Sequence, residues 1–456
     1  MVKLASAARI IQKPEPLQQT AAKGEAVCPE SDLFTTDELF GVKQDQYLKK
    51  NRSRVLADLD ALFAENRWQD IVSLYHPVEE KLPELDKADM ADMIREKIAF
   101  AFGQLKQFDD AIAQLQTCIS HDPDNYYTRS SLAYTAYSSL FAAQNREIFL
   151  SGNPRARRIE LAHENFDRAR ELRPDGVTNF YRHAMLYARI QGKNKPALNL
   201  LEQAIANWEN LTDQEKDRRH QEKKNYVKSL YRSASVLLET GEATRSLSRI
   251  QACLKQDEKT NHISLCFKYF ALGKVQFSLG QLDLAKDALR FSLQSSRKGQ
   301  PVDFVHELLA RTCMARGEVD QALDTLDKVP ERLRRPYFRW TEADALCMAG
   351  QYDRAAQILI ETASKDSRSR HIALVRLAKI SYTRGEFETG AGHAGRGVAF
   401  FREKWGNPYY EGLFWQALCA CKAGQTKQAH TCLEELETCC PHYPKLNQLS
   451  GLIKRG

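Results

Sequence analysis

Three glycines in the C-terminal part of the chain, Gly390, Gly392 and Gly395, form the pattern G-x-G-x-x-G. In dinucleotide-binding enzymes these glycines follow a strand and open a helix, whose first backbone amides hold the pyrophosphate. Here the pattern falls inside a predicted helix. We therefore interpret the glycines as positions where two helices pack closely, and we predict no nucleotide cofactor.

A cluster of thiols and one imidazole raises the question of a metal site. Its members are Cys419, Cys421, Cys432, Cys439, Cys440 and His442. The cluster lacks the C-x2-C spacing of a zinc knuckle, and on helices these thiols would point in several directions. We predict buried structural cysteines and no metal, and likewise expect Cys118, Cys253 and Cys313 to act as small core residues.

Catalytic motifs are missing from the remaining sequence. The eleven histidines form no H-E-x-x-H pair and accompany no nucleophile turn, and no Walker loop occurs. We expect a non-enzymatic protein without a cofactor.

Composition indicates a long continuous array. The 456 residues are 43% apolar and include no Pro/Gly/Ser-rich linker, and 66 basic against 59 acidic residues give a charge of +7. Scattered cysteines, odd in number, favour a reducing compartment. Without an apolar stretch suited to secretion or to a membrane span, we expect a soluble, cytoplasmic protein. An amphipathic transit peptide is an alternative, because Glu15 is the one acid in residues 1–24.

The elements that carry these residues repeat along the chain. Segments 271–289, 310–326 and 343–359 each combine a small residue, a turn glycine, and an alanine followed four residues later by a large apolar side chain. The turn glycines are Gly192, Gly241, Gly280, Gly317, Gly350, Gly385 and Gly424. The small residues that open each second helix are Ala111, Ala162, Ala197, Ser246, Ala285, Ala322, Ala355, Gly390 and Ala429.

This pattern resembles the tetratricopeptide repeat (TPR) family over residues 92–441, with Pro123, Pro174 and Pro441 after second helices. The resemblance implies an all-α fold, a right-handed superhelical α-solenoid of about nine helical hairpins with terminal capping helices. Two units, near residues 126–174 and 198–246, are longer than the family repeat. The second contains the charged run 213–219.

The chain ends depart from the repeat. Residues 1–45 lack helical periodicity and are predicted to be mostly disordered, with an acidic-hydrophobic patch at 31–40 that folds on a partner or packs as a capped turn. Residues 46–91 are predicted to form a degenerate hairpin, residues 92–441 the repeat array, and residues 442–456 a capping helix carrying Leu446, Leu449 and Leu452.

In the TPR family the first helices line a concave groove, and the ligand-facing positions carry over to this chain as an aromatic and cationic stripe. Its members are Arg182, Arg189, Lys228, Tyr231, Arg232, Phe267, Phe270, Lys274, Phe277, Phe304, Arg311, Tyr337, Trp340, Arg376, Lys379, Tyr382 and Phe414. Some of these aromatics are expected to pack between helices instead.

The favoured function is a scaffold or adaptor that binds a partner protein or peptide with acidic and apolar residues in this groove and assembles a complex. One alternative is single-stranded RNA binding, which the intermixed acids Glu307 and Asp344 make second choice. Another is a ligand-responsive sensor that controls a partner, with Asp32, Asp37 and Glu38 docking in the chain's own groove.

Overall fold

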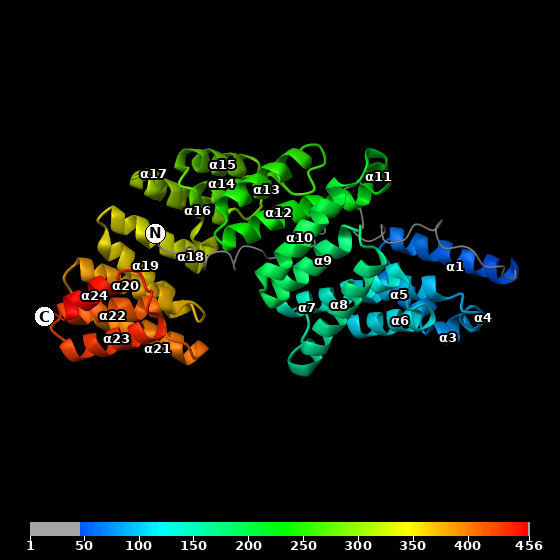
Figure 1. Ribbon diagram of the computed structural model, residues 1–456, viewed down its shortest axis with the longest axis horizontal. Helices are drawn as coiled ribbons and strands as arrows, with labels where there is room; N and C mark the ends of the chain where they lie inside the picture. Colours follow the sequence, from blue (N-terminus) through cyan, green and yellow to red (C-terminus); the bar gives the residue numbers. More distant parts are fainter. Residues whose placement is uncertain (1–45, 455–456) are drawn as a thin grey trace. The chain divides into compact units, whose positions relative to one another are not determined.

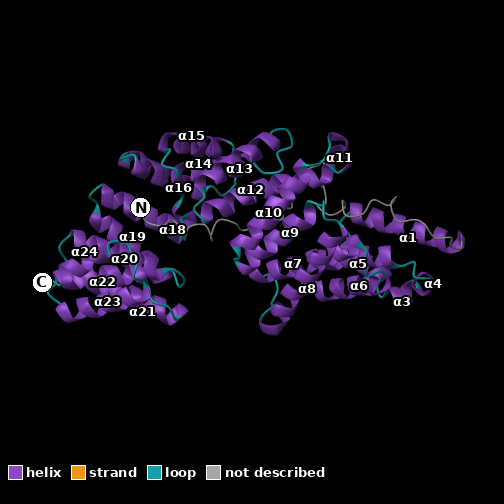
Figure 2. Ribbon diagram, viewed as in Figure 1, coloured by secondary structure: helices purple, strands orange, loops and turns teal. Residues whose placement is uncertain are grey.

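The computed structural model describes residues 46–454. The predictions for residues 1–45, including the patch at 31–40, lie outside the described residues, as do the last two positions of the capping segment. The chain divides into two compact units, an N-terminal unit that ends at Ile263 and a C-terminal unit that begins at Ser264. Among the described residues every regular element is a helix, and no strand occurs (Figure 2).

The N-terminal unit opens with α1 (Gln46–Ala64), α2 (Trp68–Tyr75) and the short α3 (Val78–Lys81) and α4 (Pro83–Lys87) (Figure 1). Its hairpins are then α5 (Asp92–Gln104) with α6 (Phe108–His121), α7 (Tyr126–Gln144) with α8 (Gly152–Leu172), α9 (Thr178–Met185) and the π-helical η3 (Leu186–Gln191) with α10 (Asn194–Glu209), and α12 (Lys223–Glu239) with α13 (Ala243–Gln256). Between the last two hairpins lie α11 (Asp213–Arg218) and η4 (His220–Glu222).

The C-terminal unit contains five hairpins and a final helix. The hairpins are α14 (Leu265–Ser278) with α15 (Leu282–Gln294), α16 (Asp303–Ala315) with α17 (Val319–Asp327), α18 (Pro336–Met348) with α19 (Tyr352–Lys365), α20 (Arg370–Thr383) with α21 (Phe387–Trp405), and α22 (Tyr410–Lys422) with α23 (Thr426–Cys439). The short η5 (Glu331–Leu333) precedes α18, and α24 (Leu446–Ile453) ends the unit.

Nine hairpins therefore occur between residues 92 and 439, and the predicted all-α helical-repeat solenoid is confirmed. The turn glycines work as expected, since each has a positive φ that a side chain would disfavour, for example 74° at Gly280. The small residues at the start of second helices are buried at the crossings, with Ala285 and Ala322 fully covered. Their size lets adjacent helices approach, and each hairpin hides its apolar stripe against the next.

The long units gain their length in different ways. In the first, α7 has 19 residues and α8 has 21, and α8 begins at Gly152, so the insert at 151–154 starts the helix. In the second, the charged run forms α11, whose start is a capping box: Thr212 and Glu215 each accept a hydrogen bond from the other's backbone N–H.

The last helix, α24, differs from the sequence prediction at one apolar position. In α24, Leu446 and Leu449 are buried as predicted, but Leu452 is 45% exposed and Ile453 takes the inward position. The apolar stripe of a short helix is wide enough for either residue, so spacing alone misplaces the third contact.

Candidate functional site: the first-helix face

The first helices of successive hairpins form one layer in each unit, which we call the first-helix face. In the N-terminal unit it comprises α5, α7, α9 with η3, and α12; in the C-terminal unit it comprises α14, α16, α18, α20 and α22. Neighbouring first helices contact one another, as α16 does α18 and α20 does α22. All seventeen residues of the predicted stripe lie on these helices, and each is buried or half-buried.

Aromatic residues of the stripe pack mainly against each other across neighbouring helices. Phe304 of α16 lies between Phe267 and Phe270 of α14, with ring centroids 5.9 and 4.7 Å away. Trp340 is only 8% exposed. In α20, Tyr382 contacts the ring of Trp415 from α22 at 5.7 Å. Phe304 and Trp340 therefore leave little ring area for a partner, whereas Tyr382 stays half-buried.

Charged residues of the C-terminal unit are paired from one first helix to the next. Arg376 of α20 donates through Nε to Asp344 of α18 at 3.0 Å. Lys379 of the same helix donates to Glu411 of α22 at 2.7 Å. Both pairs join residues 32 apart, close to the length of one repeat. The face of this unit therefore presents alternating, mutually neutralised charges.

The same offset of 32 residues links Asp303 of α16 to Arg335, which precedes α18 and donates two hydrogen bonds of 2.8 Å to it. The hydroxyl of Tyr337 donates to the same carboxylate. Asp303 was absent from the predicted stripe. A search for opposite charges one repeat apart would have found Asp303 and Arg335, whereas a search for aromatic and cationic positions did not.

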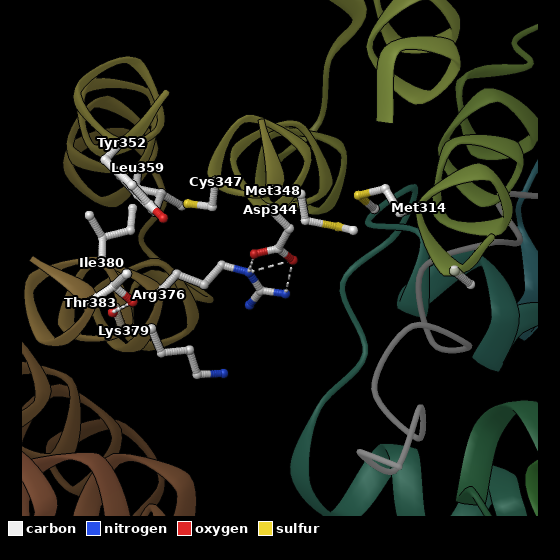
Figure 3. Close-up of a pocket in the computed structure, with 11 residues that line it drawn as sticks. Met314, Asp344, Cys347, Met348, Tyr352, Leu359, Arg376, Lys379, Ile380 and Thr383 are labelled. Carbon is white, nitrogen blue, oxygen red and sulfur yellow. Dashed lines mark hydrogen bonds and ion pairs between the residues drawn. The ribbon is translucent and has the colours of Figure 1, made fainter. Parts of the chain in front are cut away.

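A pocket of about 380 Å³ opens on this face in the C-terminal unit. Its lining residues are Met314, Ala315, Asp344, Cys347, Met348, Tyr352, Leu359, Arg376, Lys379, Ile380 and Thr383. Figure 3 shows the guanidinium of Arg376 turned toward Asp344, with Lys379 alongside on the same helix. The pocket thus combines apolar and sulfur-containing walls with an ion pair at one side, which suits an amphipathic side chain of a partner.

The thiol of Cys347, which lines this pocket, is a poor nucleophile. Burial raises the pKa of Cys347 to about 11, so the thiol is protonated at neutral pH. Among residues 46–454 no three His, Cys, Asp or Glu side chains are placed to hold a metal ion. The predicted core cysteines Cys118, Cys253 and Cys313 are at most 2% exposed, as a role in packing requires.

The glycine pattern lies inside α21, where Gly390 is the fourth helical residue, and the element before it is the helix α20 rather than a strand. A Cβ at Gly390 would lie 2.9 Å from the sulfur of Cys419 on α22, so close packing explains this glycine. By contrast, a Cβ at Gly392 would meet nothing within 4 Å. The structural interpretation holds for Gly390, while nothing in the structure explains Gly392.

In the N-terminal unit, the cations of the stripe lie over aromatic rings. The guanidinium carbon of Arg182 is 3.9 Å from the ring centroid of Tyr134, and that of Arg189 is 5.3 Å from Phe141. Both rings belong to α7. Sequence reasoning missed them because α7 lies in a long unit without a turn glycine, so the positions of the family repeat could not be carried onto it.

No family model and no curated protein matches this sequence. Solved structures that are similar include a tetratricopeptide repeat protein from Parabacteroides merdae, at 14% identity and TM-score 0.43 over 64% of this chain and 99% of that one. Yeast Tom70 is similar at 12% identity and TM-score 0.40, covering 89% and 96%.

A further similar structure is Naa15/Naa10 bound to HypK-THB, at 12% identity and TM-score 0.43, covering 91% of this chain and 71% of that one. The helical-repeat fold assigned above stands on the hairpins of this chain rather than on these likenesses. Within residues 46–454 no helix combines the length and apolar character that crossing a membrane requires.

Proposed function

We propose that this chain is a non-enzymatic, cytoplasmic scaffold or adaptor that binds a partner protein or peptide along its first-helix face and thereby assembles a complex. The observation that carries the proposal is the pocket next to the Arg376–Asp344 pair, which offers apolar walls and a charged edge on the face where the repeat presents its polar side chains. A partner segment with acidic and apolar residues matches that combination.

RNA binding is less well supported by the same face. A single-stranded RNA needs open aromatic rings for base stacking and a run of cations for its phosphates. In the C-terminal unit, acids such as Asp344 and Glu411 sit between the cations. In the N-terminal unit, the ring faces of Tyr134 and Phe141 are covered by arginines.

The proposal is tested by capture of partners from the native host with the full chain. Replacing Lys379 and Tyr382 together by alanine removes two half-buried contacts from the face and should abolish capture. The matched control replaces Leu284 and Ile360 by alanine, because these residues of second helices are 53% and 55% exposed. RNase treatment should change nothing. Capture that survives the first variant, or that RNase removes, contradicts the proposal.

A further inference from the structure

The hairpin register sets opposite charges against each other in one unit but like charges in the other. In the C-terminal unit, residues one repeat apart form acid–base pairs, as Asp344 and Arg376 do. Across the long repeat of the N-terminal unit the register is 47 residues, since Asn225 of α12 donates to Thr178 of α9. At nearly this offset, 46 residues, Lys228 of α12 follows Arg182 of α9, and these two helices contact each other.

Arg182 is unusual for a buried cation. It is 9% exposed, and its Nη1 atom is buried without a hydrogen-bond partner. Its contact with Tyr134 stabilises the flat side of the guanidinium but satisfies none of its N–H groups. Among residues 46–454 no carboxylate forms an ion pair with it. A buried guanidinium with an unpaired N–H donor carries a desolvation cost, and an anion bound at its edge would offset that cost.

The ammonium group of Lys228 is half-buried among other positive charges. Its ammonium nitrogen is 6.0 Å from the ring centroid of Tyr181, and within the described part of the chain no carboxylate neutralises it. Burial, together with the positive charges of Lys224, Arg182, Arg232 and Arg189, in that order, lowers its pKa to about 8. Several cations thus act on one half-buried amine.

We infer that Arg182 and Lys228 form an oxyanion site on α9 and α12 that takes an acidic side chain of a peptide partner, either a carboxylate or a phosphoryl group. Arg182 supplies in-plane N–H donors, and Lys228 supplies a mobile positive charge. Occupation by an anion satisfies the buried Nη1 donor of Arg182 and places a negative charge near Lys228. The inference rests on the proposed function and assigns its acidic specificity to the N-terminal unit.

A peptide is favoured over a nucleic acid because of how the rings are used. Arg182 already covers Tyr134 at 3.9 Å, so that ring is closed to a stacked base. A peptide side chain needs only the edge of the guanidinium and the head of Lys228. Burial of the site to this degree also suits one small oxyanion better than a continuous phosphodiester chain.

The test uses fluorescein-labelled peptides that share the sequence Gly-Ser-Phe-X-Gly-Phe-X-Ser-Gly, where X is Glu, phosphoserine or Gln. Fluorescence anisotropy measures their binding to the full chain, with a 15-residue oligouridylate as the nucleic-acid arm. We expect the Glu or the phosphoserine peptide to bind and the Gln peptide to bind at least about tenfold more weakly. Whichever anionic peptide binds more tightly identifies the source of the oxyanion.

Three variants make the result specific to the site. K228Q should weaken binding of the anionic peptide at least about tenfold. K255Q is the control, because Lys255 is an exposed lysine of α13 in the same hairpin, and it should bind as the unaltered chain does. R182K keeps the charge but loses the forked donors, and should fall between the two while thermal unfolding confirms that it is folded.

Four results would overturn the inference: equal binding of the Gln peptide, no binding of either anionic peptide, equal effects of K228Q and K255Q, or tight binding of the oligouridylate alone. Loss of the inference is distinguishable from loss of the proposed function. If partner capture depends on Lys379 and Tyr382 but not on Lys228, the scaffold stands and the oxyanion site falls.

Discussion

The guanidinium of Arg182 lies over the ring of Tyr134, with its central carbon 3.9 Å from the ring centroid, and the two residues come from adjacent first helices, α9 and α7. Such stacking holds a buried cation in place and leaves its edge for a hydrogen-bonded anion. The register of the long repeat places Lys228 on the neighbouring first helix, α12, at nearly the same offset that joins Thr178 and Asn225.

The affinity for an acidic peptide should fall at alkaline pH because Lys228 loses its positive charge. Its pKa is lowered to about 8, so the amine is charged below that pH and becomes neutral as the pH rises through it. The affinity for the Glu peptide should therefore fall between pH 7 and pH 9. K228R should keep its affinity over that range, since an arginine stays charged. An identical decline in K228R would show that another group titrates.

Neutralising the acids of the C-terminal unit should turn its face into a second anion site. D344N with E411Q leaves Arg376 and Lys379 without their ion-pair partners. We expect the affinity for the Glu peptide to rise, by about threefold, with a loss of stability of about 1 kcal/mol or less. D353N is the control, because Asp353 is exposed and pairs with Arg384 on another surface. An unchanged affinity would mean that peptides do not reach this unit's face.

The glycines of α21 should differ sharply when substituted. G390V places side-chain atoms against Cys419 and should lower the free energy of unfolding by about 1–3 kcal/mol. G392A is the matched control: its Cβ meets nothing, so the gain in helix propensity should raise stability by about 0.5–1 kcal/mol. Chemical denaturation measures both. A neutral G390V would argue against close packing at this crossing.

Glu96 should make the stability of the N-terminal unit depend on pH. Burial raises its pKa from 4.5 to about 7, while the hydroxyl of Thr128 donates a hydrogen bond to it. The folded chain therefore binds this proton more tightly than the unfolded chain, so the stabilisation is complete below pH 4.5 and is lost as the pH rises through about 7.

E96Q mimics the protonated carboxyl and should be more stable than the unaltered chain at pH 8, by about 1–3 kcal/mol, with the difference shrinking toward pH 5. Thermal unfolding across this pH range measures it, and E84Q, at an exposed position of α4, is the control. A difference between E96Q and the unaltered chain that stays constant with pH would show that Glu96 does not titrate in this window.

The fold could be predicted because each hairpin repeats the same local requirements. A glycine with positive φ, as at Gly280, and a fully buried alanine, as at Ala285, are needed wherever two such helices meet, so they recur at a readable spacing. In the long units, which depart from that spacing, the sequence did not predict the helix starts or the aromatic contacts. The insert at 151–154 became the start of α8, and α7 carried rings that no pattern assigned.

The site was less predictable, since its properties depend on which residues face each other across neighbouring helices. Trp340 fits a ligand-facing position by spacing yet is only 8% exposed. Asp303 escaped notice because an acid at a helix start is common, and only the structure shows it receiving Arg335 and Tyr337. Arg376 pairs with Asp344, whereas Arg182 forms no ion pair with a carboxylate of residues 46–454. This difference depends on which residues of neighbouring first helices face each other, and the sequence did not show that.

The central claim, that the first-helix face receives a partner protein, is tested most directly by photo-crosslinking in the native host. A benzophenone amino acid is placed at Lys379 or Tyr382 on the face, and at Leu284 or Ile360 on second helices, in the full chain. Mass spectrometry should recover one partner segment, rich in acidic and apolar residues, from the face positions and not from the second-helix positions. Crosslinks to a partner from the second-helix positions alone would contradict the account.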